Sequence, residues 1–265
     1  MNNTIKNNRE SEQTLNQNTN INVEIIARVF SPYKEKFAIP RQPGIVTAAT
    51  GKVVLLNKAN NIDLVRDLAQ FSHIWLIFVF HATHQQGWKP LVRPPRLGGN
   101  KKTGVFSTRS TFRPNPIGMS VVRLEKITYI NKQVELHISG LDLLDQTPIV
   151  DIKPYIPYSD AIPDAKAGFA QEQPSNSKHV SFAQKARNTL DSVQVEFPNL
   201  QTLIEQVLAQ DPRPAYKQNN SSTLHEASLI DKTNFDDKVY GIRLYRFNIK
   251  WRLISASTIE VFEIH

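Results

Sequence analysis

Three short segments of the chain concentrate side chains that could bind an anionic, nucleotide-like ligand. The first, Pro40–Ile45, is a stiff proline and glycine turn that would let backbone groups approach a ligand, although a plain loop explains it equally well. The second, Thr108–Gly118, carries two arginines and three hydroxyl side chains on a backbone restricted by proline. Because a guanidinium can pair with a carboxylate or phosphate through two parallel hydrogen bonds, this segment suits anion capture.

The third segment, Asp142–Tyr155, ends in the five residues Asp151-Ile-Lys153-Pro-Tyr155. An acid, a proline and an aromatic ring in this order are similar in chemistry to the group with which many adenine-N6 methyltransferases hold the exocyclic amine and stack the base. A turn at the end of a strand explains the same residues, so the pattern alone does not distinguish a base-binding group from a turn.

Several other kinds of chemistry are excluded by what the sequence lacks. The chain has no cysteine, which removes disulfide scaffolds, zinc fingers, iron–sulfur clusters and cysteine nucleophiles. Gly99–Gly104 has P-loop spacing, but Val105-Phe106 replaces the Lys-Ser/Thr pair that contacts phosphate and magnesium. No Gly-x-Gly-x-x-Gly follows a strand pattern. His81 and His84 lack a third metal ligand nearby, so no metal site is expected.

The positive charge of the chain is concentrated in one window. The net charge is +8, and no acidic residue occurs between Asp67 and Glu125. Within that window lie Lys89, Arg93, Arg96, Lys101, Lys102, Arg109, Arg113 and Arg123. A patch of one sign attracts polyanions, and nucleic acid is the usual partner. A solvated basic face without a partner is the alternative.

The elements that must position these segments are predicted to be mostly short strands. Apolar runs and alternation predict strands at 23–30, 52–56, 74–80, 118–127 and 133–139, and near-helical spacing predicts one helix over 62–70. The strand at 74–80 is continuously apolar, as in a strand covered on both faces. Many short strands with little helix favour a small closed or nearly closed β-barrel. The longest apolar run, 71–80, is too short to span a membrane.

A second region starts near residue 164. Helices are predicted over Ser181–Leu190 and Pro198–Gln210, and alternation from Tyr245 to Leu253 predicts a half-buried strand with a basic outer face. The run 259–264 should return antiparallel beside it. We therefore predict an α+β, mostly β protein with an Asn-rich disordered tail (1–21), an N-terminal β-barrel domain (22–163) and a C-terminal α+β domain (164–265) with a flexible excursion (217–237).

The Pro/Gly-rich stretch between residues 87 and 118 is the longest predicted connection in the barrel domain. It contains apolar residues such as Trp88, Phe106 and Ile117, which disordered linkers rarely carry. We therefore expect an ordered binding loop there.

Taken in order, these segments resemble one family, TrmO, also called TsaA-like. The resemblance is carried by 31–44, Phe71-Ser-His-Ile-Trp75, 78–81, Arg93-Pro-Pro-Arg-Leu-Gly-Gly99, 104–118 and 147–155, with 211–216 resembling the C-terminal domain of bacterial members. It implies an S-adenosylmethionine-dependent methyltransferase built on a β-barrel. The implied substrate is tRNA carrying N6-threonylcarbamoyladenosine beside the anticodon, which would be methylated on N6 in the cytoplasm by a homodimer.

The resemblance also implies site residues. The implied cofactor pocket consists of Pro43, Gly44, Ile45, His81, Arg109, Met119 and the backbone of Leu143, Leu144, Asp145 and Gln146. We hypothesise that Asp151 accepts or orients the N6 proton, with His81 as second candidate, that Tyr155 positions the base, and that Lys153 or Arg113 pairs with the threonyl carboxylate. The expected tRNA-binding residues are Arg93, Arg96, Lys101, Lys102 and Arg113.

One departure from the family pattern and two other functions stay open. The family usually has Asp-Gly-Thr-Pro where this chain has Asp145-Gln146-Thr147-Pro148, so Gln146 would be strained if the turn needs a positive φ. A non-catalytic tRNA-binding protein would show the basic patch without cofactor binding. A methyltransferase of another anionic molecule would bind the cofactor and leave tRNA unmodified.

Overall fold

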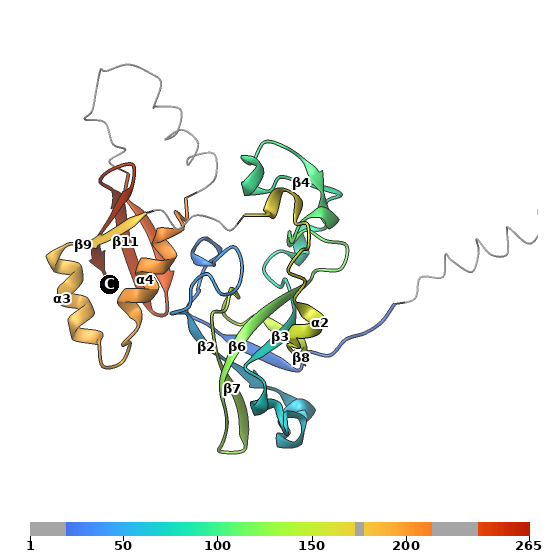
Figure 1. The fold of residues 1–265 in the computed structure, drawn as a ribbon. Helices are drawn as coiled ribbons and strands as arrows, with labels where there is room; N and C mark the ends of the chain where they lie inside the picture. The colour runs from blue at the N-terminus through green and yellow to red at the C-terminus, as the bar shows by residue number, and fades with distance from the viewer. Residues whose placement is uncertain (1–19, 173–177, 214–237) are drawn as a thin grey trace, which may run out of the picture.

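The computed structural model describes residues 20–172, 178–213 and 238–265, which form a barrel domain and a smaller sheet domain (Figure 1). Nearly all of the expected N-terminal tail and all of the expected excursion at 217–237 lie outside the described residues. No helix in the described part of the chain is long and apolar enough to cross a membrane.

The N-terminal domain is a closed barrel of antiparallel strands in the order β1-β2-β7-β6-β3-β8. The strands are β1 (Ala27–Phe30), β2 (Thr50–Leu55), β3 (His73–Val79), β6 (Ile117–Ile130), β7 (Gln133–Ser139) and β8 (Pro148–Pro154). This confirms the predicted barrel. Closure leaves none of these strands as a free edge.

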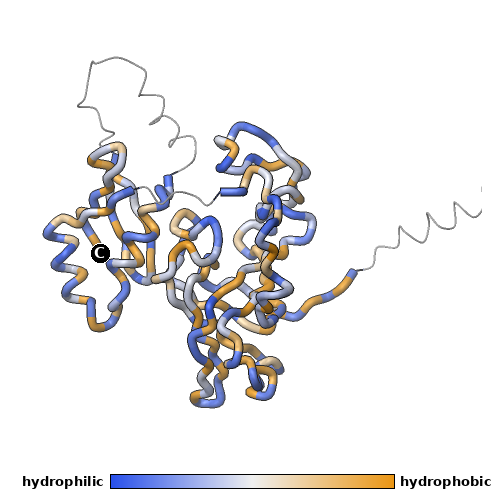
Figure 2. Tube along the Cα trace, viewed as in Figure 1, coloured by the Kyte–Doolittle hydropathy of each residue, from blue (hydrophilic) through white to orange (hydrophobic). Residues whose placement is uncertain are grey.

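The barrel interior is filled by the alternate residues of each strand. Along β3, Ile74, Leu76 and Phe78 are buried, whereas Trp75 and Ile77 are only partly buried. Strand β3 is therefore not equally covered on both faces, as the continuous apolar run had suggested. In Figure 2 hydrophobic and hydrophilic residues are mixed along the barrel strands, whereas the outermost part of the trace around β4 is hydrophilic.

The outer face of three neighbouring strands carries side chains in rows. In the first row, Met119 of β6, Ile77 of β3 and Asp151 of β8 are cross-strand neighbours. In the second row, Val121 and Trp75 lie beside Lys153. Since paired residues point to the same side of a sheet, each row forms one continuous strip of surface.

The single helix predicted over 62–70 is wrong. The structure has two 3-10 turns, η3 (Ile62–Val65) and η4 (Leu68–Gln70), separated at Asp67, whose φ is 65°. A left-handed residue cannot continue a right-handed helix. Leu64 is 65% exposed and only Val65 of η3 is buried, so the apolar spacing had no continuous face to pack against the barrel.

The long connection between β3 and β6 is ordered into short elements. Strand β4 (Leu91–Val92) pairs with β5 (Thr103–Gly104), and the side chain of Val105 is buried. The 3-10 turns of this segment are η5 (His84–Gln86), η6 (Pro95–Leu97) and η7 (Val105–Ser107). Elsewhere in the domain lie η1 (Lys36–Ala38), η2 (Asn57–Ala59), α2 (Pro157–Asp160) and, after it, η8 (Gly168–Ala170).

The C-terminal domain is a four-stranded sheet in the order β10-β11-β12-β9 with two helices. Its elements are β9 (His179–Phe182), α3 (Gln184–Val193), α4 (Leu200–Ala209), β10 (Tyr240–Leu244), β11 (Phe247–Leu253) and β12 (Thr258–Ile264). Strand β12 is antiparallel to β11, as predicted. Helix α4 buries Leu203, Ile204, Val207 and Leu208.

Two predicted boundaries in this domain are wrong. The helix expected from Ser181 begins at Gln184 because the preceding residues pair with β12 as a parallel strand. The strand expected from Tyr245 begins at Phe247 because Tyr245 has a φ of 52° and lies in the hairpin turn after β10.

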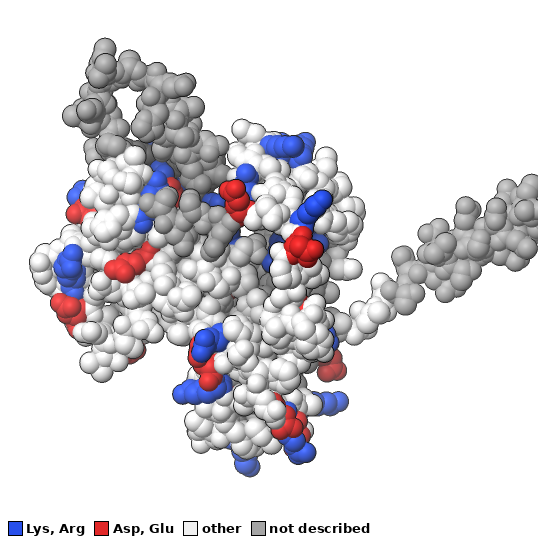
Figure 3. Space-filling view, viewed as in Figure 1, with Lys and Arg blue, Asp and Glu red and all other residues white. Residues whose placement is uncertain are grey.

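The basic outer face predicted for β11 is neutralised by acidic neighbours. Lys250 pairs with Glu263, and Arg252 pairs with Glu260. Figure 3 shows the same mixing over much of this face of the molecule, where Lys and Arg side chains lie next to Asp and Glu. The outer face of β11 therefore does not extend the cluster of basic residues between Lys89 and Arg123.

Candidate active site

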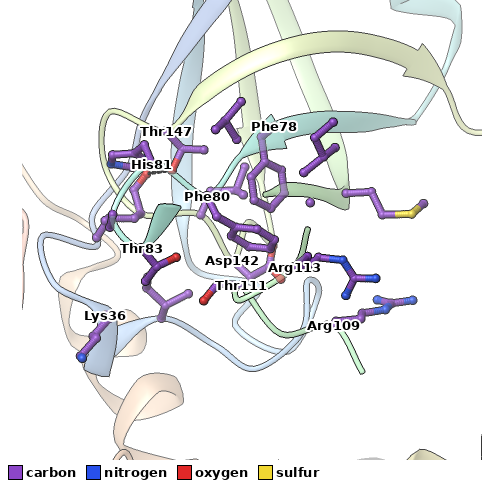
Figure 4. A pocket seen from close by; sticks show the side chains of 18 of the residues that line it. Lys36, Phe78, Phe80, His81, Thr83, Arg109, Thr111, Arg113, Asp142 and Thr147 are labelled. Atoms are coloured by element: carbon purple, nitrogen blue, oxygen red, sulfur yellow. Dashed lines mark hydrogen bonds between the residues drawn. The ribbon is translucent and has the colours of Figure 1, made fainter. Parts of the chain in front are cut away.

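A cavity of about 570 Å³ opens at the end of the barrel where β3 stops and β6 begins (Figure 4). Its walls come from three loops and the two strand ends. The lining residues are Lys36, Ile39–Gln42, Ile77–Thr83, Gln86, Thr108, Arg109, Thr111, Arg113, Ile117–Met119, Asp142–Leu144 and Thr147. It draws on all three segments that the sequence singled out.

Two aromatic rings form the apolar wall of the cavity. The rings of Phe78 and Phe80 meet edge to face with their centroids 5.1 Å apart. Gly118 lies directly against them, since a Cβ atom there would come within 2.5 Å of the Phe78 ring and 2.7 Å of the Phe80 ring. The absence of a side chain at position 118 therefore lets both rings line the cavity.

Two arginines lie together on the side of the cavity opposite His81 (Figure 4). Arg109 donates to the Gln42 side-chain oxygen at 2.7 Å, and Arg113 donates to the Thr108 carbonyl at 2.8 Å. Each guanidinium is thus oriented by one bond and keeps further N–H donors for an anion. Burial and the nearby charge of Arg28 lower the pKa of His81, so its imidazole is neutral at neutral pH.

A carboxylate that sequence reasoning missed also faces the cavity. Asp142 Oδ1 accepts a hydrogen bond from Ser120 Oγ at 2.5 Å, and Asp142 is the only acid among the lining residues. Burial raises the pKa of Asp142 to about 6, against the opposing effects of the Ser120 bond and of Arg109. The sequence signal for Asp142 was Ser120, which alternates in register with the apolar residues Val122 and Leu124. The structure shows Ser120 to be 1% exposed, and a buried hydroxyl needs a hydrogen-bond partner.

The residues expected to bind the cofactor divide between three places. His81, Arg109, Met119, Leu143 and Leu144 line the cavity. Pro43 and Gly44 line a second cavity on the barrel surface, beside His73 and Arg123, and Ile45, Asp145 and Gln146 line neither. Asp145 accepts hydrogen bonds from the Ser31 backbone N–H and Lys34 Nζ.

Gln146 has the positive φ at which a non-glycine residue is strained. Its φ is 65°, in the left-handed region that favours glycine. Its N–H donates to the Val29 carbonyl at 2.7 Å, and its carbonyl accepts from Arg28 at 3.0 Å. These two bonds hold a strained turn next to the cavity-lining residue Thr147.

The three residues expected to act on the substrate lie on the outer face of the barrel. Asp151 and Lys153 form an ion pair at 2.7 Å, and the Tyr155 ring lies 5.8 Å from that of Trp75. None of the three lines the cavity. Asp151 is nevertheless the cross-strand neighbour of Ile77, a lining residue, so the strip that carries it is continuous with the cavity wall.

The expected tRNA-binding residues lie mostly in the segment around β4 and β5. Arg113 lines the cavity, whereas Arg93, Arg96, Lys101 and Lys102 do not. Arg96 donates to the Glu172 carbonyl. The side chains of Arg93, Lys101 and Lys102 are exposed. At the outer tip of this end Figure 3 shows one group of Lys or Arg side chains without a neighbouring acid, whereas others below it lie next to an acid.

The cavity fits a ligand that contains an adenine ring and charges of both signs. Aromatic rings suit a base, the arginines suit a carboxylate, and Asp142 suits a cation. The buried Thr83 hydroxyl, also in the lining, has no partner in the described structure and is a ready contact for a polar ligand atom. Among the described residues, no group of three His, Asp or Glu side chains could hold a metal ion.

Comparisons with known proteins agree with this geometry. The model of the tRNA-methyltransferase O N-terminal domain matches residues 28–161, and that of the TrmO C-terminal domain matches residues 175–265. The tRNA (adenine(37)-N6)-methyltransferase of Escherichia coli K12 is 47% identical over 91% of this chain and 96% of its own length. The human protein of that name is 37% identical over 60% of this chain and 36% of its own.

A solved structure gives the same result. The crystal structure of TrmO from Pseudomonas aeruginosa superposes with a TM-score of 0.73 at 36% identity, covering 94% of this chain and 99% of that chain. The similarity therefore extends over the barrel domain and the sheet domain together.

Proposed function

From the premise that the chain belongs to the TrmO family, we propose that it is an S-adenosylmethionine-dependent tRNA (adenine(37)-N6)-methyltransferase. The observation that carries the proposal is the cavity. It combines an aromatic wall and two oriented arginines, all from segments that carry the family resemblance, with one buried acid, Asp142. The finer proposal is that the adenosine at position 37 carries an N6-threonylcarbamoyl group.

The cofactor would be held by charges of both signs. When bound, S-adenosylmethionine would supply a methyl group from its sulfonium for transfer to N6, and the electron pair of the C–S bond would remain on sulfur. Asp142 would face a positive group of the cofactor, and Arg109 its carboxylate. The proposed cofactor residues are otherwise those implied by the resemblance: Pro43, Gly44, Ile45, His81, Arg109, Met119, Leu143, Leu144, Asp145 and Gln146.

The substrate residues remain those of the sequence hypothesis. Asp151 would accept or orient the N6 proton, Tyr155 would position the base, and Lys153 or Arg113 would pair with the threonyl carboxylate. Their support is the outer strip, which runs from the cavity through Ile77 to Asp151. His81 is the second candidate for the proton, because its lowered pKa keeps the imidazole neutral and able to accept one.

The tRNA and a second copy of the chain would bind around the same end of the molecule. Arg93, Arg96, Lys101, Lys102 and Arg113 would contact phosphates. The homodimer would cover the apolar side chains that the β4 and β5 segment exposes outside the cavity, namely Trp88, Leu91 and Phe106, which are 52 to 77% exposed. Because tRNA is the substrate, we place the protein in the cytoplasm.

The test is transfer of a radiolabelled methyl group to threonine tRNA with and without its threonylcarbamoyl group. We expect labelling of the modified tRNA only. Labelling of both would remove the modified base from the proposal. Failure to bind S-adenosylmethionine in a calorimetric titration would favour a non-catalytic tRNA-binding protein. Cofactor binding with unlabelled tRNA would favour a methyltransferase of another anionic substrate.

A further inference from the structure

The C-terminal domain contacts the loop between β1 and β2, residues 31–49, which supplies one wall of the cavity. The lining residues of this loop are Lys36 and Ile39–Gln42. In Figure 1 helix α4 and the C-terminal sheet lie beside this loop. Apart from the 3-10 turn η1, the loop contains no helix or strand. It is held by bonds to the barrel, such as that from the Gly44 N–H to the Gly140 carbonyl at 2.8 Å, and by contacts with the C-terminal domain.

The first contact fixes the start of the loop to the hairpin turn after β10. The Tyr245 N–H donates to the Pro32 carbonyl at 2.7 Å, and Tyr33 forms an isolated β-bridge with Leu244. The Arg243 N–H donates to Glu35 Oε1 at 3.1 Å. Tyr33 and Leu244 are both completely buried, so this contact is part of the hydrophobic core that joins the domains.

The second contact fixes the end of the loop to helix α4. Gln206 Oε1 accepts the Ala48 backbone N–H at 2.9 Å, and Gln206 Nε2 donates to Thr47 Oγ1 at 3.1 Å. The adjacent residue Val207 is 2% exposed, so the backbone that carries the amide is held in the domain core. A single side chain therefore contacts the loop through both its acceptor and its donor.

A third interaction is electrostatic and acts on a lining residue, Arg41. Although Arg41 is exposed, the protein around its guanidinium lowers its pKa. Asp211 of the C-terminal domain acts in the opposite direction, and Arg96 lowers the pKa further. Asp211 is held by two bonds from the Arg213 guanidinium, at 2.7 and 2.6 Å. The Asp211-Pro-Arg213 motif thus places a fixed negative charge near Arg41.

We infer that the C-terminal domain positions the cavity wall for cofactor binding, and that Gln206 is a positioning residue in this arrangement. The loop carries Gln42, which accepts from Arg109, so its position determines where that guanidinium points. Loosening the loop disorders the wall in the empty protein, and binding must then restore the order. The inference rests on the proposed function, because the ligand used to test it is S-adenosylmethionine.

The experiment compares Gln206→Ala, Gln206→Glu and the control Gln201→Ala in the full-length protein. Gln201 lies on the same helix and bonds only to Glu205 in the described contacts. We expect Gln206→Ala to raise the Kd for S-adenosylmethionine and its KM by about 5- to 10-fold, with kcat at saturation within about twofold. Gln206→Glu keeps the acceptor for Ala48 and should recover most of the affinity. Gln201→Ala should match the wild type.

Amide hydrogen exchange separates this inference from the proposed function. In Gln206→Ala the amides of residues 40–48 should exchange faster, whether or not the cofactor is the correct ligand. If the wild type binds and methylates but Gln206→Ala keeps the wild-type Kd, the inference is overturned. If the wild type binds no S-adenosylmethionine, the proposed function fails, and unchanged exchange at residues 40–48 would then overturn the positioning role as well.

Discussion

At the scale of single residues, Gln146 occupies a backbone position suited to glycine. Its φ of 65° is held by bonds through its own N–H and carbonyl, so the conformation is imposed by β1 and not chosen by the side chain. Each non-glycine residue in this region costs about 1 kcal/mol or more. The chain tolerates this cost because β1 holds the turn through both of these bonds.

Replacing Gln146 with glycine should therefore stabilise the protein. We expect the free energy of unfolding to rise by about 0.5 to 1 kcal/mol, since relief of the left-handed strain exceeds the greater entropy of glycine in the unfolded chain. Urea unfolding measures the change. Gln146→Ala is the matched control, because it removes the same side chain but keeps the strained φ. Equal stability of the two variants would contradict the strain argument.

Asp142 makes stability and binding depend on pH in opposite ways. Its folded-state pKa of about 6 lies above the ordinary value of 3.8, so the folded protein binds this proton more tightly than the unfolded chain. The cost of burying the charged carboxylate is thus fully present above pH 6 and absent below about pH 4. The ionised form is the one proposed to face a positive group of the cofactor.

The substitution Asp142→Asn should stabilise the protein at pH 8 and weaken its binding of S-adenosylmethionine. We expect about 1 to 3 kcal/mol of added stability at pH 8 and no difference at pH 4, measured by urea unfolding at both values. The Kd for S-adenosylmethionine at pH 8 should rise at least 10-fold. A variant that is no more stable at pH 8 than the wild type would show that burial of the charge is not the cause.

At the scale of elements, strand β6 begins at the aromatic wall of the cavity. Gly118→Ala would place a methyl group 2.5 Å from the Phe78 ring, so at least one ring must move. We expect a loss of about 1 to 3 kcal/mol in stability and a weaker cofactor complex, measured by unfolding and by calorimetry. Gly104→Ala is the control, because the nearest atom to its added Cβ is 3.9 Å away. Similar losses in both variants would contradict the wall assignment.

Apolar runs and alternation predicted β1, β2, β3, β6 and β7, because apolar residues mark the buried face of a strand, but β8 was not predicted as a strand. The prediction for 133–139 agrees with β7 to the residue. The near-helical spacing at 62–70 predicted a helix that does not form, because Asp67 interrupts the backbone. Alternation itself failed at Tyr245, where it continues through a hairpin turn. Both errors come from positive φ at non-glycine residues, which no side-chain pattern reveals.

The sequence predicted which loops form the site but not which of their side chains face the cavity. Motif segments indicated which loops meet, and the cavity draws on all three of them. They did not indicate which side chains in a loop face inward. Asp142 was passed over in favour of the backbone beside it, although the buried Ser120 on the facing strand needed a partner. The roles assigned to Asp151, Lys153 and Tyr155 stay predictions.

At the scale of the whole molecule, the basic segment around β4 and β5 predicts how tRNA binding depends on salt. Lys101→Ala should weaken tRNA binding, lower the slope of log K against log salt by about 1 unit, and leave cofactor affinity unchanged. Binding titrations at several salt concentrations measure the slope. Lys58→Ala, in 3-10 turn η2 on a different connection of the barrel, is the control. A slope unchanged by Lys101→Ala would remove this residue from the tRNA surface.

The way the barrel closes also determines how fast the site can form. Strand β1 pairs with both β2 and β8, and the bond between Arg28 and Gln146 joins residues that are 118 positions apart. Such distant pairing makes folding slow, because the entropy of a long loop is lost before its contacts are gained. The cavity is built from residues on both sides of that closure. Refolding experiments should therefore recover cofactor binding only with the slowest kinetic phase of the barrel.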